Sequence, residues 1–265
     1  MTNLNQLKVK LFADGADLDS MLALYKDPSI KGFTTNPTLM KKVGITDYEK
    51  FAKQVLEAIP DRPVSFEVFA DDLTDMVTQA KVIASWGSNV NVKIPVTNTK
   101  GEFTGPVIKD LSAAGVQLNI TAIFTPVQVR AVAENLSQET PAIVSVFAGR
   151  IADTGRDPLP IMRECVGILK NLPKTELLWA SPRELLNIIQ ADEIGCHIIT
   201  ATPDLLGKLK LLEKDLSEFS METVQMFFND ASTAGYTINT QGIIRKNLGM
   251  NTKNHYLILL FLCQE

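Results

Sequence analysis

Short apolar runs alternate with amphipathic segments along most of this 265-residue chain, and this alternation strongly limits the folds open to it. The amphipathic segments carry apolar residues at spacings of three and four, the period of a helix that is buried on one side. The apolar runs have the β-branched and aromatic character of buried strands, and eight of them lie at 9–14, 32–36, 64–69, 90–96, 117–124, 142–148, 176–181 and 196–202. Strand–helix alternation repeated eight times predicts a parallel sheet closed into a (β/α)8 barrel. An open doubly wound sheet, which usually has fewer strands, is the alternative.

No linker rich in proline, glycine or serine divides the chain, so we predict one α/β domain, a single-domain (β/α)8 TIM barrel over residues 1–238. Residues 239–265 form an extra C-terminal helix or tail of unknown role, which is polar and glycine-bearing and then abruptly apolar in YLILLFLC. Two interpretations are open: the tail packs on the barrel or a neighbouring subunit, or it is a lid or a membrane contact. We favour packing, because the apolar run lacks the charged face of an interfacial helix.

The composition argues against several function classes. A net charge of -4 and a pI near 5.4, with no basic cluster, argue against a nucleic-acid partner. No apolar run is long enough to span a bilayer and the first residues do not resemble a signal peptide, so we expect a cytoplasmic protein with no membrane partner. With two histidines, three cysteines without paired spacing and no glycine-rich nucleotide motif, we expect no metal and no cofactor.

One lysine lies where an apolar side chain is expected. In NVNVKIPV (89–96), Lys93 is flanked by Val92 and Ile94 in a run typical of a buried parallel strand. A buried ammonium group is costly unless it has a partner or a chemical role. Because strand side chains alternate in direction, Lys93 points into the barrel if its apolar neighbours point outward to the helices.

The same alternation places polar side chains of other strands on the inward face. Asn119 and Thr121 lie opposite Ile120, for example, and Glu67 lies opposite Phe66. Most of these polar side chains also fall near the carboxyl ends of their strands, the end at which (β/α)8 barrels carry active sites. Their agreement in parity and height predicts one pocket, made of Asp14, Asn36, Glu67, Lys93, Asn119, Thr121 and Ser145.

A lysine with two carboxylates and several neutral hydrogen-bonding groups is suited to imine chemistry. Burial disfavours the charged form of an amine and frees its lone pair, which adds to a ketone and forms a Schiff base. The carboxylates of Asp14 and Glu67 can then divide the proton transfers of dehydration and carbon–carbon cleavage. A plain buried ion pair between Lys93 and Glu67 explains the spacing equally well.

A second group of residues indicates a phosphate site. WASPRE closes the seventh strand, with Ser181 as a natural N-cap of a helix that opens at Pro182 and Arg183 in its first turn. Arg150 follows the sixth strand in FAGR, one strand away. Helix N-termini bind phosphate, and barrels often do so after strands seven and eight, so a phosphorylated substrate is expected. The alternative is an ordinary capping box of Ser181 with Glu184 and solvated arginines.

Seven motifs, in this order, resemble the transaldolase family: FADGAD, GFTTNPTLM, SFEV, VKIPVT, LNITAIF, SVFAGRI and ASPRE. The resemblance covers roughly residues 8–238. It implies a (β/α)8 barrel that uses a metal-free lysine Schiff base to move a dihydroxyacetone unit between sugar phosphates of the pentose phosphate pathway.

Carried over by position, the resemblance assigns a role to each site residue. Lys93 becomes the Schiff-base lysine and Asp14 the acid–base at the C4 hydroxyl group. Glu67, helped by Thr121, would hold the water that relays protons at the imine. Asn36, Asn119 and Ser145 would bind the dihydroxyacetone hydroxyl groups. The phosphate would be held by Arg150, Ser181 and Arg183.

A related branch, fructose-6-phosphate aldolase, releases free dihydroxyacetone and is the main rival. That branch has glutamine and tyrosine at the positions of Glu67 and Phe147, whereas this sequence has the residues of transaldolases. A tyrosine hydroxyl near the imine can favour release, and Phe147 leaves the bound three-carbon unit waiting for an acceptor aldehyde. A non-catalytic barrel that only binds sugar phosphates is the alternative from another class. Because small family members assemble through C-terminal helices, a homo-oligomer is expected.

Overall fold

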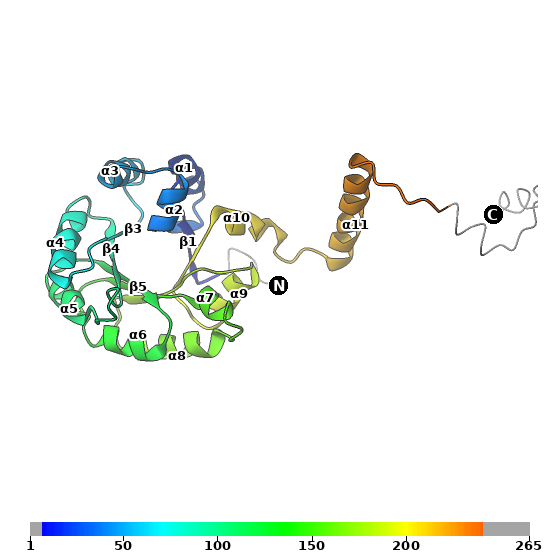
Figure 1. Cartoon of the computed structure of the whole chain (residues 1–265). Coiled ribbons are helices and arrows are strands. Elements are labelled where there is room, and N and C mark those ends of the chain that lie inside the picture. Colours follow the sequence, from blue (N-terminus) through cyan, green and yellow to red (C-terminus); the bar gives the residue numbers. More distant parts are fainter. Residues whose placement is uncertain (1–6, 241–265) are drawn as a thin grey trace, which may run out of the picture. The chain divides into compact units, whose positions relative to one another are not determined.

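The eight predicted strands form one closed parallel barrel in the computed structural model, which describes residues 7–240. Each strand pairs in parallel with the next along the chain, and β8 closes the ring on β1 (Figure 1). The strands are β1 (Lys10–Asp14), β2 (Ile30–Thr34), β3 (Val64–Glu67), β4 (Val90–Pro95), β5 (Leu118–Ile123), β6 (Ala142–Val146), β7 (Thr175–Trp179) and β8 (Ile198–Ala201). The predicted α/β class and (β/α)8 TIM barrel are therefore confirmed.

Helices surround the barrel, with at least one after each strand (Figure 1). Several begin at strong N-cap signals, because the side chains of Asp17, Asp47 and Asp72 each accept a hydrogen bond from a backbone N–H of the first turn that follows. The helices are α1 (Leu18–Tyr25), α2 (Pro37–Lys42), α3 (Tyr48–Ala58), α4 (Leu73–Ala84), α5 (Gly105–Ala113), α6 (Pro126–Ala133), α7 (Ala148–Ala152), α8 (Leu159–Leu169), α9 (Leu186–Glu193), α10 (Pro203–Leu206), the 3₁₀ helix η2 (Gly207–Leu211) and α11 (Leu216–Thr233).

The two faces of the strands contribute to two separate apolar clusters. Outward residues such as Phe66, Val92 and Ile94 are fully buried in the larger cluster, which they share with the helices. A smaller cluster lies on the inward face and consists of Phe12, Ile143, Leu178, Ala180 and Ile198, with Phe147 packed against it. The alternation of side-chain direction that predicted an inward pocket is therefore observed.

Gly32 leaves space for one member of the inner cluster. A Cβ atom at Gly32 would lie 2.5 Å from ring atoms of Phe12 on the neighbouring strand. Since real Cβ atoms do not approach other atoms so closely, a side chain at position 32 would displace the Phe12 ring. The glycine thus allows a large aromatic ring to fill the inside of a narrow barrel.

The predicted second strand, 32–36, is two residues out of place. β2 ends at Thr34, so Asn36 lies beyond the strand and is the N-cap of α2. The Oδ1 of Asn36 accepts a hydrogen bond from the Leu39 N–H at 2.9 Å. Asn36 is therefore held by the start of a helix and not by the sheet.

The helix expected to open at Pro182 begins four residues later. α9 starts at Leu186 and no side chain caps it. Ser181 instead has a positive φ of 57°, a conformation that is uncommon outside glycine. The predicted N-cap at Ser181 is therefore wrong, and the alternative capping box with Glu184 does not form either.

The chain divides into two compact units, Met1–Glu213 and Lys214–Glu265. The first unit contains the barrel. The second contains α11, of which no residue is buried and which lies within the range 1–238 predicted for the barrel. The domain limit at residue 238 stays a prediction, and the tail 239–265 lies almost entirely outside the described residues.

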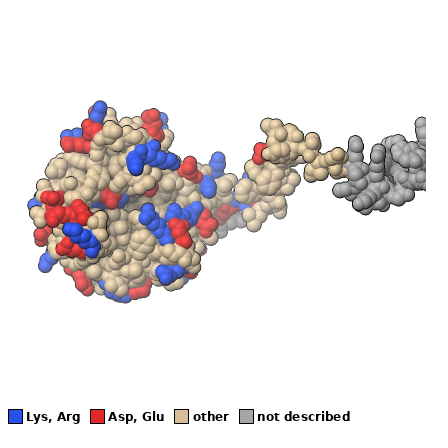
Figure 2. All heavy atoms as spheres, viewed as in Figure 1, with Lys and Arg blue, Asp and Glu red and all other residues tan. Residues whose placement is uncertain are grey.

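Acidic and basic side chains are interspersed over the face of the barrel unit seen in Figure 2. Within residues 7–240, no helix combines the length and apolar character needed to cross a membrane. The same part of the chain has no group of three or more His, Cys, Asp or Glu residues that could hold a metal ion. Its two free thiols, Cys165 and Cys196, are buried, and burial raises the pKa of each to about 12, so neither is a nucleophile at neutral pH.

Candidate active site

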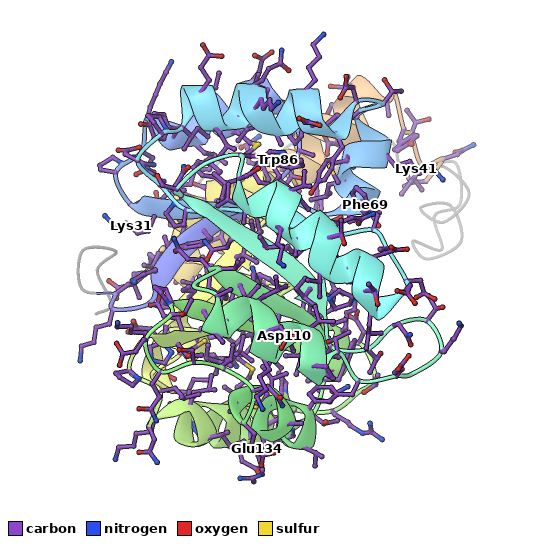
Figure 3. All side chains as sticks on the ribbon, turned by 90° about the vertical axis from the view of Figure 1, so that its left-hand side faces the viewer. Lys31, Lys41, Phe69, Trp86, Asp110 and Glu134 are labelled. Carbon is purple, nitrogen blue, oxygen red and sulfur yellow. The ribbon has the colours of Figure 1, made fainter. Side chains whose placement is uncertain are left out.

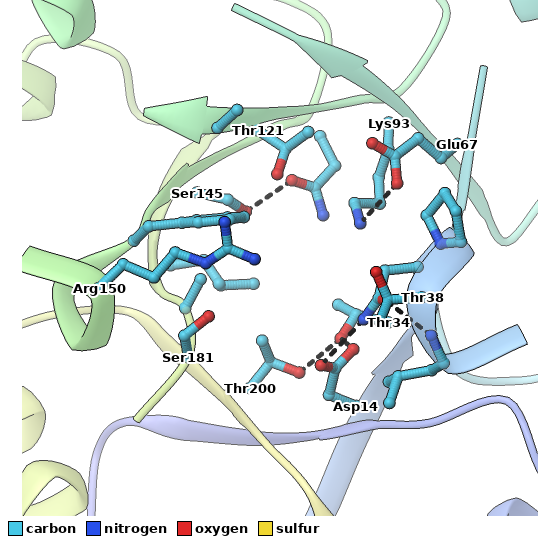
Figure 4. Close-up of a pocket in the computed structure, with 18 residues that line it drawn as sticks. Asp14, Thr34, Thr38, Glu67, Lys93, Thr121, Ser145, Arg150, Ser181 and Thr200 are labelled. Atoms are coloured by element: carbon cyan, nitrogen blue, oxygen red, sulfur yellow. Dashed lines mark hydrogen bonds and ion pairs between the residues drawn. The ribbon is translucent and has the colours of Figure 1, made fainter. Parts of the chain in front are cut away.

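A cavity of about 370 Å³ lies at the carboxyl ends of the strands and is lined by at least one side chain from every strand. Figure 4 shows Lys93 and Glu67 on one side of this cavity. Asp14 and Ser145 face it from other strands, Arg150 from α7, and Ser181 from the loop after β7. Of the eleven site residues predicted from the sequence, ten line the cavity and Arg183 does not. The lining residues that the sequence analysis missed are Thr34, Pro37, Thr38, Leu39, Ala122, Leu178, Ala180 and Thr200.

Lys93 lies in the wall of this cavity with 9% of its side chain exposed. Its Nζ donates to the carbonyl oxygen of Thr35 at 2.7 Å and to Oε2 of Glu67 at 3.2 Å. The barrel register creates the second contact, because Glu67 and Lys93 are paired positions on adjacent strands. The ion pair considered from the sequence therefore exists, but it faces a cavity large enough for a substrate. An amine beside a carboxylate in such a cavity is equipped to form an imine.

Asp14 ends β1 and accepts two hydrogen bonds. Thr34 Oγ1 donates to its Oδ1 at 2.8 Å, and Asn36 Nδ2 donates to its Oδ2 at 3.4 Å. Burial raises the pKa of Asp14 above its ordinary value of 3.8; the Lys93 charge and these two hydrogen bonds oppose the rise, and the Glu67 charge adds to it. A carboxyl group with a raised pKa is suited to exchange a proton with a bound hydroxyl group.

A threonine on β8 extends the network around Asp14. Thr34 Oγ1 lies 2.6 Å from Thr200 Oγ1. A hydroxyl group has one proton, and that of Thr34 goes to Asp14, so Thr200 is the donor in this contact. The alternation that predicted the pocket also applies to both threonines, because Thr34 and Thr200 each lie near the carboxyl end of a strand, opposite apolar neighbours.

Three buried polar side chains form a second network, on β3, β5 and β6. Ser145 Oγ donates to Asn119 Oδ1 at 2.6 Å, and Asn119 Nδ2 donates to Ser65 Oγ at 3.0 Å. These bonds fix which way the Asn119 amide points. Asn119 and Ser145 line the cavity together, as the sequence predicted.

An irregularity in β5 sets the position of Thr121. The pairing of β5 with β6 shifts between Ile120 and Ile123, and Ala122 has a φ of 60°. Consecutive residues of a regular strand point to opposite faces, but here Thr121 and Ala122 both line the cavity. The bulge thus widens the face that β5 presents to a substrate.

The region predicted to bind phosphate is partly assembled. Arg150 and Ser181 line the cavity, and the Arg150 guanidinium lies over the Phe147 ring, 5.0 Å from its centroid. Arg183 instead forms an exposed ion pair with Asp153. Hydrogen bonding from Arg183 lowers the pKa of Asp153, which keeps the pair charged. The structure therefore brings one of the two predicted arginines into the cavity.

Tyr48 holds the backbone of Glu67 from behind, and the sequence analysis missed it. Its hydroxyl accepts from the Glu67 N–H at 2.6 Å and donates to the Glu67 carbonyl oxygen at 3.0 Å. The ring packs edge-on against Phe66 and Trp86, and burial raises the pKa of Tyr48. These contacts fix the carboxyl end of β3, which carries the Glu67 side chain that pairs with Lys93.

Comparison with known proteins identifies the family. Residues 11–251 match the family model described as Transaldolase/Fructose-6-phosphate aldolase. The chain belongs to this family. It is therefore a transaldolase-type enzyme.

Several relatives agree with this assignment. A "Probable transaldolase" of Nitrosopumilus maritimus is 33% identical over 216 residues, 81% of this chain and 92% of the relative. A protein of the same name from Dehalococcoides mccartyi is 35% identical over 202 residues, 76% of this chain and 90% of the relative. Another from Thermoanaerobacter sp. is 31% identical over 231 residues, 87% of this chain and 100% of the relative.

Solved structures of more distant proteins share the fold. Dihydrodipicolinate synthase from Rhodopseudomonas palustris superposes with a TM-score of 0.54 at 15% identity, covering 84% of this chain and 79% of that one. A putative lyase/mutase from Burkholderia cenocepacia superposes with a TM-score of 0.55 at 10% identity, covering 91% and 92%. At such identities the likeness supports the barrel fold and nothing further.

Proposed function

We propose that this protein is a transaldolase that transfers a dihydroxyacetone unit between sugar phosphates through a Schiff base on Lys93. The reaction converts sedoheptulose 7-phosphate and glyceraldehyde 3-phosphate reversibly into erythrose 4-phosphate and fructose 6-phosphate, within the pentose phosphate pathway. The observation that carries the proposal is the cavity-facing Lys93 amine, 3.2 Å from the Glu67 carboxylate. The relatives named probable transaldolase support the same reaction.

The first half of the reaction uses three side chains. The neutral Lys93 amine adds to the ketose carbonyl carbon, and the carbinolamine loses water to give an imine while Glu67, helped by Thr121, relays the protons. Asp14 then takes the proton of the C4 hydroxyl group. The electrons of the C3–C4 bond move into the imine, the aldehyde leaves, and an enamine remains on Lys93.

The second half reverses these steps with another aldehyde. The enamine carbon attacks the aldehyde carbonyl carbon, and the new alkoxide takes the proton back from Asp14. Water adds to the resulting imine, and the product ketose leaves as the Lys93 amine is restored. The raised pKa of Asp14 supports this role, because the group must hold a proton between the two halves.

The remaining site residues bind and orient the substrate. We assign Asn36, Asn119 and Ser145 to the dihydroxyacetone hydroxyl groups, since all three line the cavity near Lys93. Arg150 and Ser181 would hold the phosphate. Arg183 is assigned to the same phosphate, which requires it to leave Asp153 when substrate binds.

A fructose-6-phosphate aldolase that releases free dihydroxyacetone is the second candidate, since the family description names both activities. Two residues favour transfer. Glu67 lies beside Lys93 as a carboxylate, and Phe147 presents an apolar ring to the cavity in place of the hydroxyl expected in the aldolase branch. A barrel that binds ketose phosphates without turnover is a third reading, and a complete set of Lys93, Asp14 and Glu67 argues against it.

Borohydride trapping with fructose 6-phosphate tests all three candidates. The protein is incubated with and without erythrose 4-phosphate, reduced, and analysed by intact and peptide mass. Transfer predicts a stable adduct on the Lys93 peptide, little free dihydroxyacetone, and loss of the adduct when acceptor is added. The Lys93→Met variant should form no adduct, while Lys109→Met, which removes an exposed lysine, should behave as wild type.

The other outcomes are equally specific. An adduct accompanied by steady release of dihydroxyacetone would assign the protein to the aldolase branch. Binding of fructose 6-phosphate without any adduct on Lys93 would reject the Schiff base and leave the binding barrel.

We further propose that the enzyme is a cytoplasmic homo-oligomer without nucleic-acid or membrane partners. Support for assembly comes from α11, on which Leu216, Met221, Val224 and Phe228 are all more than half exposed. An apolar helix surface of this kind is stabilised by burial against a second copy. Light scattering of the full chain checks this, because a monomer at micromolar concentration would contradict it.

A further inference from the structure

A second cavity lies at the opposite end of the barrel, and the proposed reaction does not use it. It measures about 340 Å³ and opens at the amino ends of the strands. Figure 3 places Lys31, one of its lining residues, on the side of the barrel opposite Phe69 and Lys41. No residue lines both this cavity and the active-site cavity. Phe12 and Ile143 of the inner apolar cluster form part of its wall.

The mouth of this cavity is rich in positive charge. Its charged lining consists of three lysines and one carboxylate, Lys10, Lys31, Lys174 and Glu176. Lys10 pairs with Glu176 at 2.8 Å, and Lys174 pairs at 3.0 Å with Glu139, whose side chain is 87% exposed. Lys31 donates to a backbone carbonyl oxygen and has no ion-pair partner within residues 7–240. Exposed ion pairs are weak, so the paired lysines can also turn toward an anion.

An amide in the cavity wall has no partner among the described residues. Asn91 is only 4% exposed and lines the cavity, and within residues 7–240 its side chain forms no hydrogen bond. Its amide atoms are not among the fully buried polar atoms without a partner in that range, which are Thr175 Oγ1 and Trp179 Nε1, so solvent in the cavity, or a ligand that displaces it, can reach them. Gln117 beside it donates to the Ser88 carbonyl oxygen at 3.1 Å, which leaves its own side-chain oxygen as an acceptor. The wall thus offers donors and acceptors that the protein itself does not use.

We propose that this cavity is a second binding site, for a small hydroxylated anion such as a phosphate ester or a hydroxycarboxylate. The ammonium groups of Lys31 and Lys174 neutralise the anionic end at the mouth. Asn91 and Gln117 bind the hydroxyl groups deeper in the cavity. The site is independent of the Schiff-base chemistry, because Phe12 and its neighbours separate it from Lys93.

Calorimetric titration with glycerol 1-phosphate, at constant ionic strength, tests the proposal. This compound has a phosphate and two hydroxyl groups but no carbonyl group, so it cannot form an imine. Wild type should bind it at two sites. Lys31→Met/Lys174→Met should weaken one site about tenfold or more, and Asn91→Leu should weaken the same site about tenfold. Arg150→Met should affect the other site, and Lys109→Met, which removes an exposed lysine elsewhere, should affect neither.

One result would overturn the proposal. If the double lysine variant binds as wild type does, and all binding is lost in Arg150→Met, the anion binds at the active-site cavity alone. The lysine side chains are exposed, so their variants are expected to fold even if Asn91→Leu does not. Failure of the proposed function would instead appear as missing imine chemistry at Lys93, which this titration does not measure.

Discussion

A Cβ atom at Gly149 would lie 1.5 Å from the carbonyl oxygen of Ser181. The Gly149 N–H also donates to the Ala180 carbonyl oxygen at 3.3 Å. The turn after β6 is therefore in direct backbone contact with the loop after β7. Because Arg150 follows Gly149, this contact fixes the spacing of Arg150 and Ser181, two of the three side chains that we assign to the phosphate.

Gly149→Ala should weaken substrate binding strongly, because α7 and the loop after β7 must move apart. We expect KM for fructose 6-phosphate to rise about tenfold or more, since a displacement of about 1 Å at a binding site has effects of this size. Gly167→Ala is the matched control, because a Cβ there meets nothing within 4 Å and should stabilise α8 by up to about 1 kcal/mol. An unchanged KM in Gly149→Ala would contradict the assignment of this corner to the phosphate.

Asp14→Asn should abolish turnover and stabilise the fold at neutral pH. Burial raises the Asp14 pKa in the folded protein, so the folded state favours the protonated, neutral carboxyl group. This protonation stabilises the folded state at pH values below 3.8, the Asp14 pKa in the unfolded chain. The stabilisation is lost as pH rises through the pKa of Asp14 in the folded protein. The neutral amide avoids this loss, so the variant should gain about 1.4 kcal/mol per unit of pKa shift.

Chemical denaturation of both proteins between pH 3 and pH 8 measures this difference. The advantage of Asp14→Asn should be largest at high pH and vanish in acid. Asp17 offers a control of opposite sign, because hydrogen bonds from Ser20 lower its pKa and its contribution is lost as pH falls. An Asp14 variant less stable than wild type at pH 8 would show that the carboxylate is stabilised by its neighbours.

Most of the fold could be predicted because the residues on the outer face of the barrel are apolar and alternate along each strand. Strands such as VNVKIPV place apolar side chains on alternate positions, and the polar residues between them, Asn91 and Lys93, identified the inward face. Asn119 and Ser145 were found by the same parity and do line the cavity, whereas Asn36 lines it from the N-cap of α2, beyond the strand on which it was predicted. Parity works here because every strand of a closed barrel has one face toward the helices and one toward the axis.

The site predictions that were wrong or missed share a different cause. Ser181 has a local sequence that favours an N-cap, but its backbone conformation accompanies the tertiary contact with Gly149, which lies after the preceding strand, β6. The partner of Arg183 is Asp153, 30 residues earlier, and Thr200 meets Thr34 across 166 residues. No periodicity reports such contacts, because they depend on how loops from different strands meet.

Thr200→Val should slow catalysis while leaving substrate binding intact. Thr200 donates to Thr34, which donates to Asp14, and neighbouring hydrogen bonds polarise one another. Without the first donor the Thr34 bond to Asp14 weakens, so the Asp14 pKa should rise further. We expect kcat to fall about three- to tenfold, which corresponds to the free energy of one hydrogen bond. The acidic limb of the pH profile of kcat should move to higher pH. A change in KM alone would assign Thr200 to substrate contact instead.

Tyr48→Phe should destabilise the barrel by about 2–3 kcal/mol. The change keeps the ring that packs on Phe66 and Trp86 but leaves the buried N–H and carbonyl group of Glu67 without their partner. Urea denaturation measures the loss, and a lower kcat should accompany it because the Glu67 carboxylate is less well held. Tyr25→Phe is the control, since its hydroxyl bonds to Asp61 at an exposed position and should matter much less. Equal losses in the two variants would mean that the Tyr48 hydroxyl has no special part in fixing β3.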